Sequence, residues 1–154
     1  TGHNTDAYGF HQSIKPFLTN KHERAIILGT GGASKAIVHV LKQIGIDCIF
    51  ISRNPVGENQ FSYADINEHM LRACKLIVNC TPVGMYPDTK ACIELPFQFL
   101  TPDHLVVDLI YNPVKTQLLQ RSEAQGAQIL NGETMLKQQA LMAWKIWQEE
   151  LPLR

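Results

Sequence analysis

The chain has 154 residues, of which 45% are hydrophobic, and its 14 basic residues are balanced by 14 acidic ones. This length and composition predict one globular domain with a substantial core and exclude a largely disordered chain. The balanced charge argues against a nucleic-acid or membrane surface, and no apolar run approaches the roughly 20 residues of a membrane span.

The spacing of apolar residues predicts strands that alternate with helices at short intervals. In chain order we expect a helix at 4–18 broken near Pro16, a strand at 24–28, a helix at 33–44, a strand at 48–51, a helix at 65–73, strands at 76–80 and 105–110, a helix at 115–125, a short strand at 127–130 and a long helix at 133–149. The strand at 48–51 is a continuous apolar run, which is typical of a strand buried on both faces. The alternation predicts a doubly wound, mostly parallel sheet of the Rossmann-like α/β class with flanking helices.

The most informative segment runs from Ala25 to Ala36. Four apolar residues lead into a glycine cluster, and a helical pattern follows at once. Gly29 lets the chain turn sharply, Gly31 lets the backbone approach a pyrophosphate, and the N–H groups at the helix start attract its charge. The third position of the dinucleotide fingerprint is here Ser34, so a glycine-rich structural turn remains the alternative to a dinucleotide site.

Polar turns also follow the other strands, and ligands of doubly wound sheets gather at the carboxyl ends of strands. After the second strand come Ser52, Arg53 and Asn54. Asp47 has the sequence spacing of the acid that binds NAD ribose, but it begins the strand and so lies on the far side of the sheet from the ligand. Arg53 suits a 2′-phosphate because its guanidinium donates two charge-assisted hydrogen bonds, so NADP is favoured over NAD. An ordinary solvated arginine is the alternative.

The cysteines and histidines predict no metal site. The four cysteines form no C-x-x-C pair and lie mostly in apolar segments, so they are expected to be buried and reduced. The six histidines are scattered without metal-ligand spacing.

Five segments, in their order and spacing, resemble the shikimate dehydrogenase family. They are Gly2–Phe10, Gly29–Ala36, Asn79–Met85, Leu109–Pro113 with Thr116 and Leu118-Leu119, and Gly132 with Met135-Leu136 and Gln139-Ala140. The resemblance implies a cytoplasmic oxidoreductase that reduces 3-dehydroshikimate to shikimate with NADPH in aromatic amino-acid biosynthesis. It covers only the later part of such enzymes, so we expect the N-terminal substrate domain and its catalytic lysine to lie outside this chain, which alone is expected to be inactive.

The resemblance also implies roles for individual residues. Asp6 matches the catalytic partner of the lysine and a substrate contact, with a helix N-cap as its alternative role. Asn4, Tyr111 and Gln139 match further substrate contacts, and a backbone carbonyl is the alternative partner for the Gln139 amide. The residues expected to hold the cofactor are Gly29, Thr30, Gly31, Gly32, Ala33, Ser52, Arg53, Asn54, Asn79, Thr81, Val83, Leu109, Gly132 and Met135. This chain has no second basic residue close behind Arg53 that could also bind the 2′-phosphate of NADP.

The expected organisation has three parts: a hinge helix at 1–20, a dinucleotide-binding domain at 21–132, and a C-terminal helix at 133–154 that would pack on the substrate domain. That last helix is apolar over more than one stripe, so self-association is also expected. Two other functions stay open: a quinate/shikimate dehydrogenase that uses NAD, and a non-catalytic nucleotide-binding regulatory module.

Overall fold

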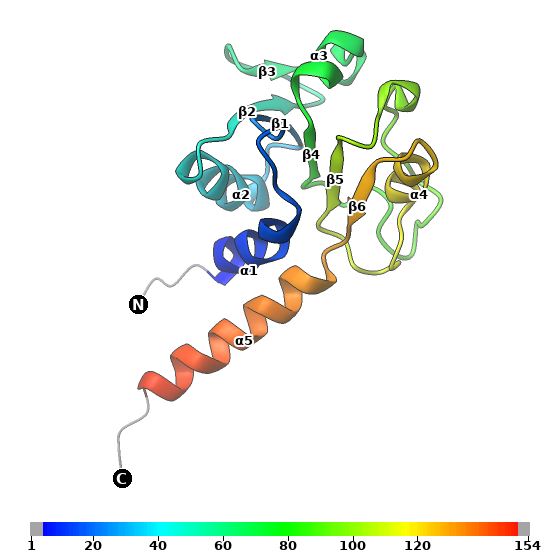
Figure 1. Cartoon of the computed structure of the whole chain (residues 1–154). Helices are drawn as coiled ribbons and strands as arrows, with labels where there is room; N and C mark the ends of the chain where they lie inside the picture. The colour runs from blue at the N-terminus through cyan, green and yellow to red at the C-terminus, as the bar shows by residue number, and fades with distance from the viewer. Residues whose placement is uncertain (1–4, 151–154) are drawn as a thin grey trace.

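The computed structural model describes residues 5–150, whose centre is a six-stranded, fully parallel sheet in the order β3-β2-β1-β4-β5-β6 (Figure 1). The strands are β1 (Arg24–Leu28), β2 (Asp47–Ile51), β3 (Gln60–Phe61), β4 (Leu76–Asn79), β5 (Leu105–Asp108) and β6 (Gln128–Leu130). This topology confirms the predicted doubly wound α/β class. The order reverses between β1 and β4, which is where such sheets bind their ligands.

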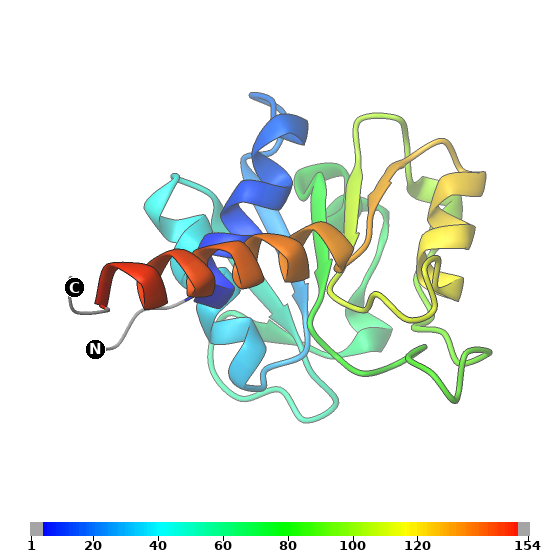
Figure 2. The same cartoon turned by 90° about the horizontal axis from the view of Figure 1, so that it is seen from below.

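Helices cover both faces of the sheet. They are α1 (Thr5–Ile14), α2 (Gly32–Gln43), α3 (Glu68–Ala73), α4 (Gln117–Ala124) and α5 (Glu133–Glu150), with short 3-10 helices at Lys15–Phe17, Tyr63–Asp65 and Phe97–Phe99. The core cluster on one face includes residues of α1 and α2, and the cluster on the other face includes residues of α3 and α4. Helix α5 crosses α1 and continues beyond the sheet (Figure 2).

Strand β1 shows why the sheet has two apolar cores. Ala25 and Ile27 point toward α1 and α2, whereas Ile26 and Leu28 point toward α3 and α4, and all four are fully buried. Burying each large aliphatic side chain is worth about 1.5–3 kcal/mol, so a central strand covered on both sides is apolar at every position.

The predicted helix at 65–73 is wrong at its start. Helix α3 begins at Glu68, because the Asn67 side chain caps it by accepting the Met70 N–H at 2.9 Å. Upstream, Asp65 accepts hydrogen bonds from the Ser62 backbone and hydroxyl, both at 2.9 Å, which closes a separate 3-10 turn. Two local caps therefore divide the segment into two helices.

The prediction that the second strand is buried on both faces is also wrong. Cys48, Ile49 and Phe50 in β2 are only half-buried. Beyond β2 lies only the two-residue β3, and the connection between these strands, residues 52–59, contains no helix. The outer part of the sheet is therefore left uncovered beside α2.

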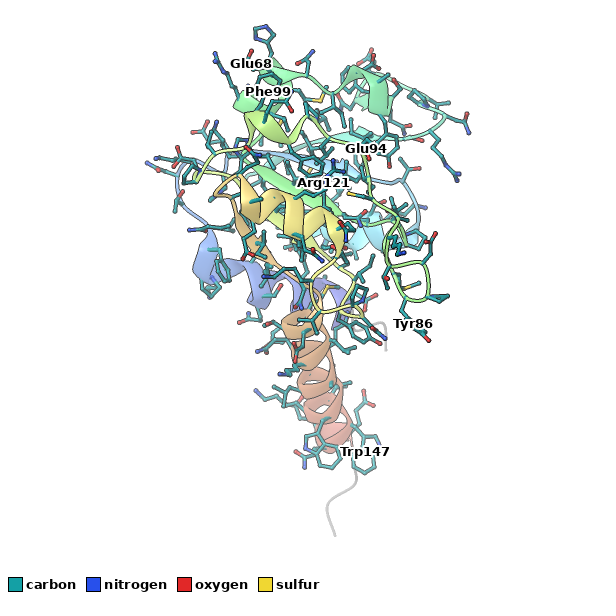
Figure 3. The ribbon with its side chains drawn as sticks, turned by 90° about the vertical axis from the view of Figure 1, so that its right-hand side faces the viewer. Glu68, Tyr86, Glu94, Phe99, Arg121 and Trp147 are labelled. Carbon is teal, nitrogen blue, oxygen red and sulfur yellow. The ribbon has the colours of Figure 1, made fainter. Side chains whose placement is uncertain are left out.

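Helix α5 keeps large apolar side chains exposed, and it has no buried residue. Leu136, Leu141, Trp144 and Trp147 are each at least 42% exposed, and the two tryptophan rings lie 5.2 Å apart. Trp147 lies near the far end of the helix, away from the sheet (Figure 3). An apolar surface of this kind is typical of an interaction site.

Two histidines close turns in the same way. The His104 Nδ1 accepts the Thr101 N–H at 3.0 Å, and its Nε2 donates to the Leu71 carbonyl at 2.7 Å. The His22 Nδ1 likewise accepts the Thr19 N–H at 3.0 Å. A nitrogen that accepts an N–H must be unprotonated, so these bonds require neutral imidazoles.

We expect the protein to lose stability as the pH falls below about 6.5. Burial is the largest effect on both histidines, and it lowers the pKa of His22 and of His104 below 6.5. The unfolded chain then binds more protons than the folded chain, so acid favours unfolding. Urea titrations at about pH 7.5 and about pH 5.5 measure the loss. His104→Gln should show a smaller loss than the unaltered protein and exposed His69→Gln the same loss; an unchanged loss in His104→Gln would contradict this explanation.

Candidate functional site

The loop between β1 and α2 turns at Gly29, which has φ of +100°. Its N–H donates to the Ile51 carbonyl at 2.9 Å, and a Cβ atom placed on it would lie 2.9 Å from Cγ2 of Thr81. Only glycine combines this backbone conformation with such a close neighbour. The loop after β1 therefore lies directly against the turn that follows β4.

The first turn of α2 is open toward solvent. Gly31 is its N-cap and supplies no side-chain cap, and a Cβ placed on Gly31 or Gly32 would meet nothing within 4 Å. Backbone N–H groups at an uncapped helix start, with space in front of them, suit a phosphate group. The Ser34 side chain is buried and its hydroxyl donates to the Gly31 carbonyl at 2.6 Å. The third fingerprint position, Ser34, thus holds a small residue that fits into the core. The geometry of the whole loop suits a dinucleotide.

A hollow of about 450 Å³ lies at the carboxyl ends of β4 and β5. It is lined by Ala33, Cys80, Thr81, Pro82, Met85, Tyr86, Leu109, Ile110, Tyr111 and Asn112. It brings together four of the predicted site residues, Ala33, Thr81, Leu109 and Tyr111, which come from the start of α2 and from the turns after β4 and β5. Tyr86 lies on the exposed rim (Figure 3). Since Ala33 belongs to α2, the hollow adjoins the open helix start.

Asn79 lies beneath this hollow and is fully buried. Its amide nitrogen donates to Asp108 Oδ1 at 3.1 Å, and its amide oxygen accepts from the Thr81 hydroxyl at 2.6 Å. Asp108 Oδ2 accepts from the Thr116 hydroxyl at 2.7 Å, and burial raises the pKa of the Asp108 carboxyl above its usual range. These bonds join the ends of β4 and β5 to the N-cap of α4, so the walls of the hollow are held firmly.

Asp108 was not among the predicted site residues, although a signal for it exists. It ends the apolar run Leu105–Val107, and a carboxylate beside a buried strand needs several hydrogen-bond partners. The sequence motif does not show which partners these are.

Val83, which was predicted to contact the cofactor, packs against the core, and its N–H donates to the Thr81 hydroxyl at 3.3 Å.

Asp6 and Gln139 meet where α1 packs against α5. The Gln139 amide nitrogen donates to Asp6 Oδ1 at 2.6 Å, although the residues are 133 positions apart. Asp6 lies in the first turn of α1, and Met135 packs against the adjoining core. Two of the four predicted substrate residues are thus neighbours. Tyr111 lines the hollow described above, and Asn4 lies outside the described residues.

The turn after β2 presents Arg53 at the surface. Ser52 donates its N–H to the Phe61 carbonyl at 2.9 Å, and the Asn54 N–H donates to the Ser52 hydroxyl at 3.2 Å. These bonds order the turn. The Arg53 charge favours the ionised form of Tyr63 and partly offsets the rise in that residue's pKa that burial causes.

Asp47 pairs in register with Arg24 at the amino-terminal ends of β1 and β2, opposite the strand ends that border the candidate site. This position agrees with the expectation that Asp47 is remote from a ligand at the carboxyl ends of the strands. The end of β2 carries an arginine and no acid.

The described residues hold no cluster of three histidine, cysteine or acidic side chains that could bind a metal. All four cysteines are free, and burial raises the pKa of Cys48 and Cys74 to about 11 and of Cys80 to about 12. Cys74 is buried, whereas the other three are half-buried. Within residues 5–150, no helix has the length and apolar character that a membrane crossing requires.

Several known proteins are similar to this chain in sequence and in structure. No family model matches the chain. The shikimate dehydrogenase (NADP+) of Desulforamulus reducens is 33% identical over 95% of this chain and 57% of its own length. The solved shikimate 5-dehydrogenase of Thermus thermophilus, in complex with NADP(H) and shikimate, is 30% identical with a TM-score of 0.78, covering 97% of this chain and 58% of that one.

A third relative is a quinate dehydrogenase from Corynebacterium glutamicum, solved in complex with NAD. It is 30% identical with a TM-score of 0.80, covering 96% of this chain and 57% of its own. The chain thus spans less than 60% of the length of each of these three relatives.

Proposed function

Because this chain is a homologue of the shikimate dehydrogenases in sequence and in fold, we propose that it is the NADP-binding part of an enzyme that reversibly reduces 3-dehydroshikimate to shikimate. The observation that carries the proposal is the open first turn of α2 beside the hollow at the ends of β4 and β5. This is where a doubly wound sheet binds a dinucleotide.

The proposed cofactor contacts come from five segments, which follow β1, β2, β4, β5 and β6. The N–H groups of Gly31, Gly32 and Ala33 would hold the pyrophosphate, and NADPH would supply a hydride when bound. The remaining predicted residues would form the walls of the binding site: Gly29, Thr30, Ser52, Arg53, Asn54, Asn79, Thr81, Val83, Leu109, Gly132 and Met135. The buried bonds of Asn79 support this by fixing the turn that carries Thr81.

The acid–base part of the proposal rests on Asp6. Reduction of a ketone needs a proton on oxygen as hydride reaches carbon. We propose that a lysine outside this chain moves the proton and that Asp6 orients this lysine and tunes its pKa. Gln139 supports the role because its amide holds one Asp6 oxygen and leaves the other able to accept. Asn4 and Tyr111 would contact substrate hydroxyls.

The proposal extends to the arrangement of the chain. Residues 1–20 and 133–154 would contact a substrate domain and 21–132 would bind the dinucleotide, in a cytoplasmic enzyme. The exposed leucines and tryptophans of α5 support contact with that domain or with a second copy. Arg53 at the end of β2, without an acid there, favours NADP over the NAD-using alternative. A regulatory nucleotide-binding module would not need the Asp6–Gln139 pair.

The proposal predicts that the chain binds NADP+ more tightly than NAD+ and that Arg53→Ala removes most of this difference. A charge-assisted hydrogen bond is worth about 1.5–3 kcal/mol, so NADP+ affinity should fall about tenfold or more. The affinity for NAD+ should hardly change. Isothermal titration calorimetry with both dinucleotides gives the values, with Arg72→Ala on α3 as the control. Equal affinities for NADP+ and NAD+ in the unaltered protein would contradict the proposal.

A further inference from the structure

A second hollow, of about 400 Å³, lies along the side of α2. It is lined by Thr30, Ser34, Lys35, Val38, His39, Lys42, Phe50 and Gln60. One wall is α2, and the other is formed by β2 and β3. Its volume falls within the range of small-ligand sites.

The hollow exists because the sheet is uncovered at this edge. Phe50 and Gln60 are register partners in β2 and β3, so their side chains point to the same face. Phe50 belongs to the core cluster on the α2 face. Since residues 52–59 form no helix to cover this face, the Phe50 ring and the Gln60 amide border the hollow.

The charge of this hollow is one-sided. Lys35, His39 and Lys42 lie at helical spacing along the same edge of α2, and all three are exposed. The residues that line the hollow include no carboxylate. Within the described part of the chain, neither lysine forms an ion pair. Two unpaired ammonium groups beside an aromatic ring and an amide suit a ligand with both a phosphate and a planar ring.

The position of the hollow links it to the dinucleotide loop. Thr30, in the turn between Gly29 and Gly31, lines one end of it, and Lys35 lies next to the buried Ser34. Lys42 lies at the other end of α2, where it also borders a neighbouring hollow that contains Asp47. Lys35 is therefore the cation nearest the proposed pyrophosphate position along the helix.

Arg53 lies just beyond the end of β2 and is exposed. Lys35 lies in the first turns of α2 and lines the hollow beside β2. A phosphate at the end of β2 would thus have one cation in the turn after that strand and a second on α2. The second cation would take the place of the basic residue that is lacking close behind Arg53.

We propose that the hollow beside α2 receives the adenosine 2′-phosphate of NADP and that Lys35 is a second specificity-determining cation for it. The inference rests on the proposed function and deepens it. Lys35 provides a mobile point charge with three donors, which can follow a phosphate without fixed geometry. The Phe50 ring provides apolar surface for the adenosine.

The test is calorimetry of the 154-residue protein with NADP+ and with NAD+, using Lys35→Gln and, as a matched control, Lys21→Gln. Lys21 precedes β1, so it lies at the opposite ends of the strands from the dinucleotide loop, and it lines neither hollow described above. Both lysines are exposed, so both variants should keep the unfolding midpoint of the unaltered protein. We expect Lys35→Gln to weaken NADP+ binding about tenfold and NAD+ binding less than about twofold. Lys21→Gln should change both affinities less than about twofold.

Each other outcome has a definite meaning. If Lys35→Gln leaves NADP+ affinity unchanged while Arg53→Ala lowers it, this inference fails and the proposed function stands. If Lys35→Gln weakens NADP+ and NAD+ equally, Lys35 acts on a group that both dinucleotides share, and the 2′-phosphate assignment is overturned. An equal loss in Lys21→Gln would show a diffuse charge effect and also overturn it. If the unaltered protein binds neither dinucleotide, the proposed function itself fails.

Discussion

In the proposed shikimate dehydrogenase, Asp6→Asn is expected to lower kcat about 100- to 10,000-fold. The substitution keeps the size of the side chain and its ability to accept the Gln139 amide at 2.6 Å, but it removes the charge. Without that charge the lysine that we propose as the proton donor would no longer be oriented or have its pKa tuned. Steady-state kinetics with shikimate and NADP+ measure the effect.

The affinity for NADP+ separates a catalytic role from a structural one. It should stay nearly unchanged in Asp6→Asn, because the dinucleotide loop is built from other elements. Asp103→Asn, which removes an exposed acid that pairs with Lys21, is the control and should leave kcat unaltered. Gln139→Ala should mainly raise the KM for shikimate, since it is proposed to hold a hydroxyl. If kcat of Asp6→Asn stays within about threefold, Asp6 only stabilises the start of α1.

Gly132→Ala is expected to destabilise the protein by about 3 kcal/mol or more. Gly132 links β6 to α5, and its N–H donates to the Ile110 carbonyl at 3.0 Å. A Cβ placed on it would collide with the carbonyl oxygen of Leu109. The obstacle is backbone that continues from a buried strand, so no side chain can rotate away. Since domains are stable by only about 5–15 kcal/mol, much of the folding free energy would be lost.

Urea unfolding followed by circular dichroism measures this loss, and Gly31→Ala provides the contrast. Gly31 has φ of −74°, and a Cβ placed on it would point into open space. The free energy of unfolding of Gly31→Ala should therefore differ from that of the unaltered protein by less than about 1 kcal/mol. A loss below about 1 kcal/mol in Gly132→Ala would mean that the β6–α5 junction can shift. The junction would then not fix the position of α5 and Gln139.

Several elements could be predicted because their signals are local. β1 was predicted with its observed bounds, since four apolar residues end at a glycine whose positive φ stops the strand. The prediction for α2 was correct within one residue at each end, because its apolar residues recur at helical spacing up to Gly45. The glycine loop between them follows from the same few residues. In such segments, neighbours in the sequence supply most of the interactions that decide the conformation.

Other features depend on residues that are far apart in the chain. The Asp6–Gln139 contact, the bonds of Asp108 to Asn79 and Thr116, and the two-residue β3 have no local pattern. The apolar run of β2 predicted burial on both faces, yet its cover depends on what residues 52–59 form, and they form no helix. Sequence pattern thus determined most of the elements and the dinucleotide loop, but not β3 or the start of α3. Only the tertiary structure decided which polar groups meet and which surface of the sheet stays open, because those outcomes depend on contacts that form after the elements have packed together.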